Sequence, residues 1–155
     1  MKAANILKYY WKATRSVSFM LRFIIVNIYA RIPSRKIREF LIERSNHTYY
    51  FRTPFGEFIA HTTFGWYVLG PYYENDIKKF IDKNIKEFSK DKTKIFIDVG
   101  AHIGRYVVQL RKNHNYSALA FEPSPETFRT LKTNIFLSEI EDSVELFNYG
   151  LGSKE

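Results

Sequence analysis

Four residues of types that bind charged or sugar-containing ligands fall at the ends of two predicted strands. Asp98 ends one short apolar run, and Gly100 and Gly104 follow it. Glu122 ends a second apolar run, eighteen residues after Gly104. In open α/β sheets, ligands bind outside the carboxyl ends of the strands. The pattern therefore predicts a site at that edge of a sheet, with Glu122 placed to accept hydrogen bonds from both hydroxyls of a ribose.

The spacing of the glycines helps to separate two nucleotide cofactors. Dinucleotide sites carry G-x-G-x-x-G, whereas this chain has Gly100-x-x-x-Gly104 and lacks a G-x-x-x-x-G-K-[ST] phosphate loop. The carboxylate of Asp98 beside the loop suits a ligand with an ammonium and a sulfonium better than one with a pyrophosphate. The pattern thus favours S-adenosylmethionine over NAD. A turn glycine and a capping aspartate in an ordinary α/β protein remain the alternative interpretation.

The elements around these residues alternate between strand and helix. Apolar runs at 95–97, 118–121 and 144–149 are separated by helical patterns, and Ser124-Pro125 is a favoured start for the second helix. This order predicts an α/β, Rossmann-like fold with a parallel βαβαβ sheet. Continuous apolar runs of this kind are typical of strands buried on both faces.

The chain upstream of this sheet predicts two further parts. Residues 1–45 form a basic amphipathic helical segment, with a second helix at 35–43 capped by Ser34. Residues 46–90 contain a hairpin (49–52 and 57–62), a strand at 66–69 and a helix beginning at Asn75 or Asp76. Residues 91–155 then form the ligand-binding βαβαβ half-domain.

Composition and charge limit the possible functions. The chain has 155 residues and no cysteine, which excludes disulfides, thiolate metal sites and cysteine nucleophiles and fits a cytoplasmic protein. Its net charge is +8, yet residues 1–38 hold nine basic side chains and no acidic one. Such a segment predicts an anionic membrane surface as partner, or packing of its apolar face on the domain; nucleic acid is the third alternative. The run 23–30 is too short to span a bilayer.

Two motifs resemble those of the FkbM-type methyltransferases. Phe96-Ile97-Asp98-Val99-Gly100-Ala101-His102-Ile103-Gly104 resembles the first motif of that family, and Ala120-Phe121-Glu122-Pro123-Ser124-Pro125-Glu126 resembles the second. Lys132-Thr133-Asn134, Gly150-Leu151-Gly152 and the upstream Gly70-Pro71-Tyr72-Tyr73-Glu74 are similar to shorter family signatures. The likeness covers about half of the chain, from Tyr72 to Glu155, and departs from the family at His102, where asparagine is usual.

The resemblance implies methyl transfer from S-adenosylmethionine, usually to a hydroxyl of a glycan, a lipid-linked sugar or a natural product. It implies that Asp98, Gly100 and Gly104 shape the methionine end of the site and that Glu122 holds the ribose. Ala101 and His102 are also expected to bind the cofactor. Tyr73 and Glu74 would cover the cofactor, although Glu74 could equally cap the helix beside it. We identify no catalytic base and no metal ligands, and His61, His102 and His114 are expected to be structural or exposed.

The resemblance also predicts further strands after the third one, which would supply the acceptor site. We therefore expect a truncated or split protein in which a second copy or a partner chain completes the sheet. Two functions stay open: a methyltransferase that acts near a membrane, and a non-catalytic module that binds S-adenosylmethionine or assembles with a partner.

Overall fold

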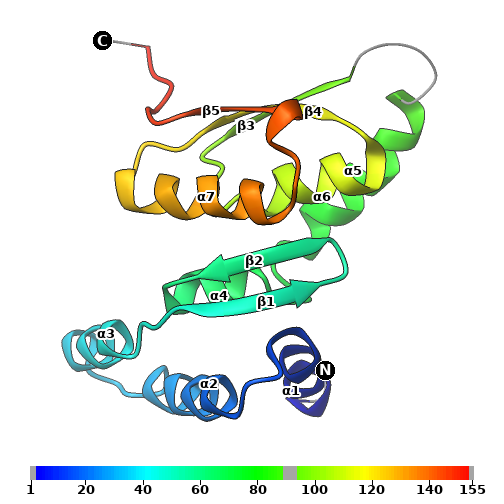
Figure 1. Ribbon diagram of the computed structural model, residues 1–155. Helices are drawn as coiled ribbons and strands as arrows, with labels where there is room; N and C mark the ends of the chain where they lie inside the picture. The colour runs from blue at the N-terminus through cyan, green and yellow to red at the C-terminus, as the bar shows by residue number, and fades with distance from the viewer. Residues whose placement is uncertain (1–2, 89–93, 154–155) are drawn as a thin grey trace. The chain divides into compact units, whose positions relative to one another are not determined.

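The computed structural model describes residues 3–88 and 94–153 (Figure 1). The chain divides into two compact units. Unit 1 comprises residues 1–53 and 59–73, and unit 2 comprises residues 54–58 and 74–155. The boundary predicted between residues 90 and 91 lies outside the described residues.

Unit 1 contains most of the helical segment predicted at the N-terminus. Its elements are α1 (Ala3–Thr14), α2 (Val17–Tyr29), α3 (Arg35–Arg44), β1 (Tyr49–Thr53), the end of β2 (Gly56–Ala60) and α4 (Thr63–Val68). The hairpin of β1 and β2 was predicted from the two β-rich runs around Pro54 and Gly56 and is confirmed. Among the described residues, no helix is both long enough and apolar enough to cross a membrane.

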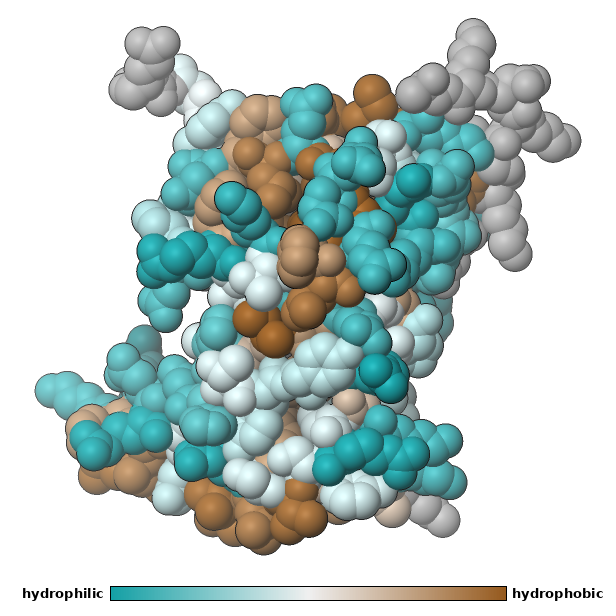
Figure 2. Space-filling view, in the orientation of Figure 1, coloured by the Kyte–Doolittle hydropathy of each residue, from teal (hydrophilic) through white to brown (hydrophobic). Residues whose placement is uncertain are grey.

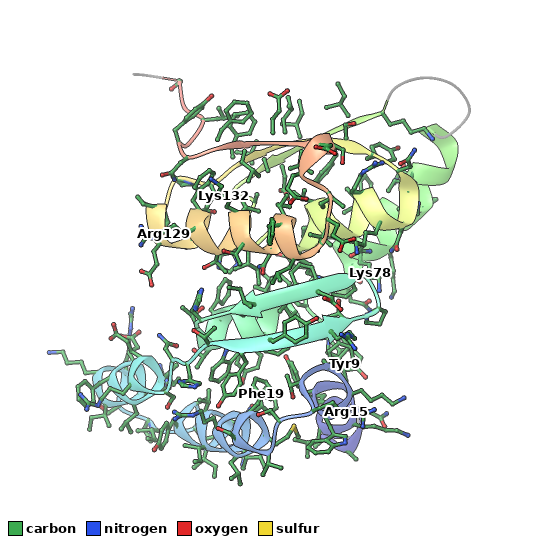
Figure 3. All side chains as sticks on the ribbon, viewed as in Figure 1. Tyr9, Arg15, Phe19, Lys78, Arg129 and Lys132 are labelled. Atoms are coloured by element: carbon green, nitrogen blue, oxygen red, sulfur yellow. The ribbon has the colours of Figure 1, made fainter. Side chains whose placement is uncertain are left out.

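An aromatic core holds unit 1 together. Phe19 points from α2 toward β1 (Figure 3), and its ring meets those of Phe51 and Trp66 edge-on at 5.2 and 5.3 Å. Tyr10 of α1 is also buried, and its hydroxyl donates to the Trp66 carbonyl at 2.9 Å. Buried aromatic rings of this size contribute a large share of the burial free energy of a small unit.

Two local predictions in unit 1 are wrong. Residues 66–69 were expected to form a strand, but α4 occupies this segment because Thr62 accepts a bond from the Gly65 amide at 3.0 Å and caps the helix. The helix expected after Ser34 does form, as α3, but the Ser34 side chain makes no capping hydrogen bond. Tertiary packing of Trp66 overrides the β preference of that short run.

Unit 2 has the predicted alternation of strand and helix. Its elements after the hairpin turn are α5 (Asn75–Phe88), β3 (Ile95–Val99), α6 (Arg105–His114), β4 (Ser117–Phe121), α7 (Pro125–Leu137), a short 3-10 turn (Glu141–Ser143) and β5 (Val144–Phe147). The strands form a parallel sheet in the order β3-β4-β5, with Asp98 opposite Ala120 and Phe121 opposite Phe147. The predicted parallel βαβαβ fold is therefore confirmed.

The sheet is covered on one face only within the described residues. Helices α6 and α7 lie on the same side of it (Figure 1). On the other side, Ile95, Ile97 and Val99 of β3 are each more than half exposed. The expectation that β3 is buried on both faces is thus wrong for the described chain, since no described helix of unit 2 packs against that second face.

Candidate functional site

The loop between β3 and α6 is folded against the end of β4. The amides of Gly100 and Ala101 both donate to the Phe121 carbonyl, at 2.8 and 2.9 Å. Gly100, His102 and Gly104 all have positive φ, at 81°, 51° and 83°. Repeated left-handed residues make the chain turn tightly, which brings the backbone of the loop to the carboxyl edge of the sheet.

Glycine is needed at the two positions of the loop for different structural reasons. A Cβ at Gly104 would lie 2.6 Å from Leu131 Cδ1, so this glycine permits the close packing of α6 on α7. A Cβ at Gly100 would meet nothing within 4 Å. Gly100 therefore borders open space, as expected where a ligand approaches the backbone.

Glu122 links the loop after β3 to the start of α7. Its side chain is buried, with Oε2 accepting from the His102 amide and Oε1 accepting from the Ser124 amide, both at 2.9 Å. A carboxylate has about four lone-pair sites, so each oxygen retains one for a second donor. The residue predicted to hold a ribose thus also holds the protein loop in shape.

Three carboxylates of unit 2 lie close enough to influence one another. Burial, together with the charges of Glu74 and Glu122, raises the pKa of Asp98 to about 6. Asp98 Oδ2 is buried and has no hydrogen-bond partner in the described structure. A buried carboxylate oxygen without a donor, beside two like charges, is a site for a cationic group.

Glu74 is held toward this cluster by a tyrosine. Its Oε2 accepts a 2.6 Å hydrogen bond from the Tyr106 hydroxyl, and its backbone has a φ of 46°. The alternative role, as a side-chain cap of α5, finds no support in this contact, because the carboxylate is directed to α6. Its carbonyl, by contrast, accepts from the Lys78 amide at 3.0 Å.

Tyr73 differs from the other predicted site residues because it belongs to unit 1. There its ring meets Phe64 edge-on at 6.1 Å, and it lines a cavity of about 530 Å³ with Tyr10, Phe23 and Tyr67. Unit 2 itself brings together the remaining predicted residues: Glu74, Asp98, Gly100, Ala101, His102, Gly104 and Glu122.

Sequence reasoning missed three residues that shape the site. Tyr106 positions Glu74 by donating a hydrogen bond from its hydroxyl to Oε2 of that residue. Arg105 is 3% exposed, with its guanidinium over the Phe55 ring at 5.1 Å. Asn134, fully buried, donates from Nδ2 to the Ile103 carbonyl at 2.9 Å and fixes the loop to α7. The position of Asn134 in the Lys132-Thr133-Asn134 motif was the sequence feature that could have identified it.

The chemistry of the site is that of binding and orientation. Burial lowers the pKa of His102, against the opposing effect of Glu122, so its imidazole is neutral at pH 7. The described residues contain no group of three or more histidines and carboxylates arranged to hold a metal ion. The geometry therefore defines a cluster of carboxylates beside a tight glycine loop.

Comparisons with known proteins agree with this class of fold. No protein-family model matches the chain. It is 33% identical over 79 residues to Methyltransferase 1 of Beauveria bassiana, a match that covers 49% of this chain and 30% of that protein.

Solved structures show the same fold at lower identity. P. horikoshii TYW2, in complex with MeSAdo, matches with a TM-score of 0.50 and 16% identity, over 68% of this chain and 37% of that one. A second structure from Pyrococcus horikoshii, of a protein assigned as a transferase, matches with a TM-score of 0.50, 18% identity and the same coverage. The chain therefore has the Rossmann-like fold of these proteins, is similar to a methyltransferase, and spans about a third of the length of the proteins it matches.

Proposed function

We propose that this chain binds S-adenosylmethionine and is the cofactor-binding part of an S-adenosylmethionine-dependent methyltransferase. The observation that carries the proposal is the buried, unpartnered Asp98 Oδ2 beside Glu74 and Glu122. S-adenosylmethionine has an ammonium and a sulfonium, which three carboxylates attract, whereas the pyrophosphate of NAD would be repelled by them. The similarity to Methyltransferase 1 supports the same conclusion.

In this proposal, different residues of the site bind different parts of the cofactor. Asp98 faces its cationic methionine end, and Gly100 and Ala101 leave room for it because no side chain fills the space at Gly100. Glu122 receives ribose hydroxyls on its remaining lone pairs. His102 and Gly104 hold the loop in its left-handed turns, and Glu74 covers the cofactor. When bound, S-adenosylmethionine supplies an electrophilic methyl group on its sulfonium.

The acceptor in this proposal is a hydroxyl of a glycan, a lipid-linked sugar or a natural product, as in the FkbM-type proteins that the motifs resemble. Methyl transfer of this type depends mainly on positioning, with a base required to accept the hydroxyl proton. We place the protein in the cytoplasm, peripheral at a membrane, with residues 1–45 as its basic segment, residues 46–90 as its central part and residues 91–155 as its cofactor half-domain.

The uncovered sheet face favours a second candidate, a module that binds the cofactor and assembles with a partner. Ile95, Ile97 and Val99 are exposed on β3, and parallel sheets normally have both faces covered. A second copy or a partner chain that covers this face would bury it and supply the acceptor site. Activity would then require the assembly.

Calorimetric titration of the full chain with S-adenosylmethionine tests the proposal. We expect binding that falls at least tenfold in Asp98→Asn, with Asp142→Asn, an exposed acid outside the site, as the matched control. Unchanged affinity in Asp98→Asn would contradict the assigned role of Asp98, and no binding by the unsubstituted chain would contradict the function. Transfer of a labelled methyl group to glycan or lipid extracts then separates an enzyme from a binding module.

A further inference from the structure

Helix α2 has two opposite apolar faces, and only one of them is buried. Phe19, Phe23 and Val26 are at most 6% exposed and pack into the core of unit 1. On the other side, a stripe at spacings of three and four residues is exposed by 41 to 63%: Val17, Leu21, Ile24, Ile25 and Ile28. The packing interpretation of this segment therefore applies to one side of the helix, and the other side is exposed.

Helix α3 extends the exposed stripe. Ile37 and Phe40 are 54% and 57% exposed, and the guanidinium of Arg44 lies over the Phe40 ring at 5.4 Å. Helix α3 contacts α2, and we call the seven exposed apolar residues of these two helices the apolar face. Figure 2 shows apolar atoms gathered over α2 and α3 at the lower edge of the view. Exposed apolar surfaces that are continuous over two helices mark interaction sites.

The charge around the apolar face is strongly positive. Unit 1 holds eleven basic and two acidic side chains, a net charge of +9, whereas unit 2 holds thirteen basic and fourteen acidic, a net charge of −1. Lys8 and Lys12 are exposed on α1, the helix that contacts α2, and the exposed Arg15 follows the end of α1 (Figure 3). Within the described part of α3, Arg35 forms a salt bridge with Glu39 at 2.8 Å. Lys8, Lys12 and Arg15 are exposed and therefore accessible to an anionic partner.

We infer that unit 1 docks on the surface of an anionic lipid bilayer, with the apolar face of α2 and α3 at the acyl boundary and the cations at the headgroup phosphates. An aliphatic stripe flanked by Lys and Arg is the composition of helices that lie in a membrane interface. A nucleic acid would match the charge but would leave the aliphatic stripe in water. Helix α2, with 13 residues, is too short to span a bilayer, so it lies along the surface.

The experiment uses the full chain and sedimentation with vesicles of phosphatidylcholine alone or with about 30% phosphatidylglycerol. The first variant is Leu21→Glu with Ile28→Glu, both at exposed positions of the apolar face. Its matched control is Phe136→Glu on α7, which is 67% exposed. A charge variant, Lys12→Glu with Arg15→Glu, is compared with Lys112→Glu and Lys132→Glu in unit 2. Far-ultraviolet circular dichroism of each variant checks that its fold is retained.

We expect the unsubstituted chain to bind the anionic vesicles and to leave them at about 1 M salt, where charges are screened beyond roughly 3 Å. Both unit 1 variants should lose at least tenfold in partitioning, and both controls should retain it. Binding that is absent, or equal in all four variants, would overturn the inference. A dimer that dissociates in Leu21→Glu with Ile28→Glu, without vesicle binding, would assign the face to self-association instead.

A labelled oligonucleotide provides the remaining comparison. The membrane assignment would be overturned in favour of nucleic acid by three results together. The chain would bind the oligonucleotide tightly but not the vesicles, Lys12→Glu with Arg15→Glu would abolish oligonucleotide binding, and Leu21→Glu with Ile28→Glu would leave it unchanged. The measurements do not involve the cofactor, so the failure of the proposed methyl transfer and the failure of the docking surface are distinguishable.

Discussion

Replacement of Asp98 by asparagine is expected to stabilise the protein while it weakens cofactor binding. The substitution keeps the shape of the side chain and removes its charge. In the structure, Asp98 Oδ2 is buried without a hydrogen-bond partner, and the neighbouring charges of Glu74 and Glu122 oppose ionisation. The ionised carboxylate is therefore unfavourable in the folded chain until a cation binds.

The pKa of Asp98 gives the size and the pH range of this effect. The rise from 3.8 to about 6 corresponds to about 3 kcal/mol, at 1.36 kcal/mol per unit. Between these two pH values the folded chain keeps the proton that the unfolded chain has lost, so the free energy of unfolding falls as pH rises. Above about pH 6 the whole penalty is present, and below about pH 4 it is absent.

Urea unfolding of both chains at about pH 4 and pH 7.5 measures the penalty. We expect Asp98→Asn to be more stable by up to about 3 kcal/mol at the higher pH, roughly 10 °C in melting temperature, and equal at the lower pH. Saturating S-adenosylmethionine should narrow the difference at pH 7.5 by at least about 1.4 kcal/mol, the equivalent of the tenfold difference in affinity, because the cofactor compensates the charge only in the unsubstituted chain. Asp142→Asn serves as the exposed control.

Two results would refute the reasoning. A stability difference that does not change with pH would show that Asp98 is not an ionised, destabilising group in the folded chain. A loss of stability in Asp98→Asn at pH 7.5 would show that the carboxylate has a donor within the protein, so that no cationic ligand is required to satisfy it.

Further predictions concern the loop, its supports and the sheet. Gly104→Ala should cost about 2 to 4 kcal/mol in urea unfolding, from its φ of 83° and the contact with Leu131, whereas Gly100→Ala should cost about 1 to 2 kcal/mol and mainly lower cofactor affinity. Tyr106→Phe should reduce affinity by about tenfold through release of Glu74, measured by calorimetry against Tyr116→Phe. Ser124→Ala should lose about 1 kcal/mol of stability, because the Thr127 amide loses its capping oxygen. Ile97→Lys should shift any assembly to monomers in sedimentation velocity, while Phe136→Lys should not.

Local sequence patterns were sufficient for the order of elements in unit 2. The Ser124-Pro125 start of α7 was predicted, and the Ser124 hydroxyl accepts from the Thr127 amide at 3.3 Å. The Gly100-x-x-x-Gly104 spacing predicted a turn, and both glycines have positive φ. These features depend on residues within a few positions of one another, so the sequence contains the information that determines them.

Features that depend on distant residues could not be predicted. The segment at Trp66 has β-rich composition but is helical, because the Trp66 ring is buried against Phe19 and its indole nitrogen donates to the carbonyls of His47 and Ala60. The partial burial of β3 was also not predicted, because an apolar run in the sequence does not show whether helices cover one or both faces of the strand.

The sequence by itself determined the parallel βαβαβ order, the glycine turn and the concentration of positive charge in the first 38 residues, because each is a property of short-range spacing and composition. Only the tertiary structure decided that Glu74, Asp98 and Glu122 influence one another, that Tyr106 holds Glu74, and that one side of α2 is buried while the other is exposed. Those properties arise from contacts between residues far apart in the chain, and the electrostatic cost of Asp98 exists only when folding has removed water from its carboxylate.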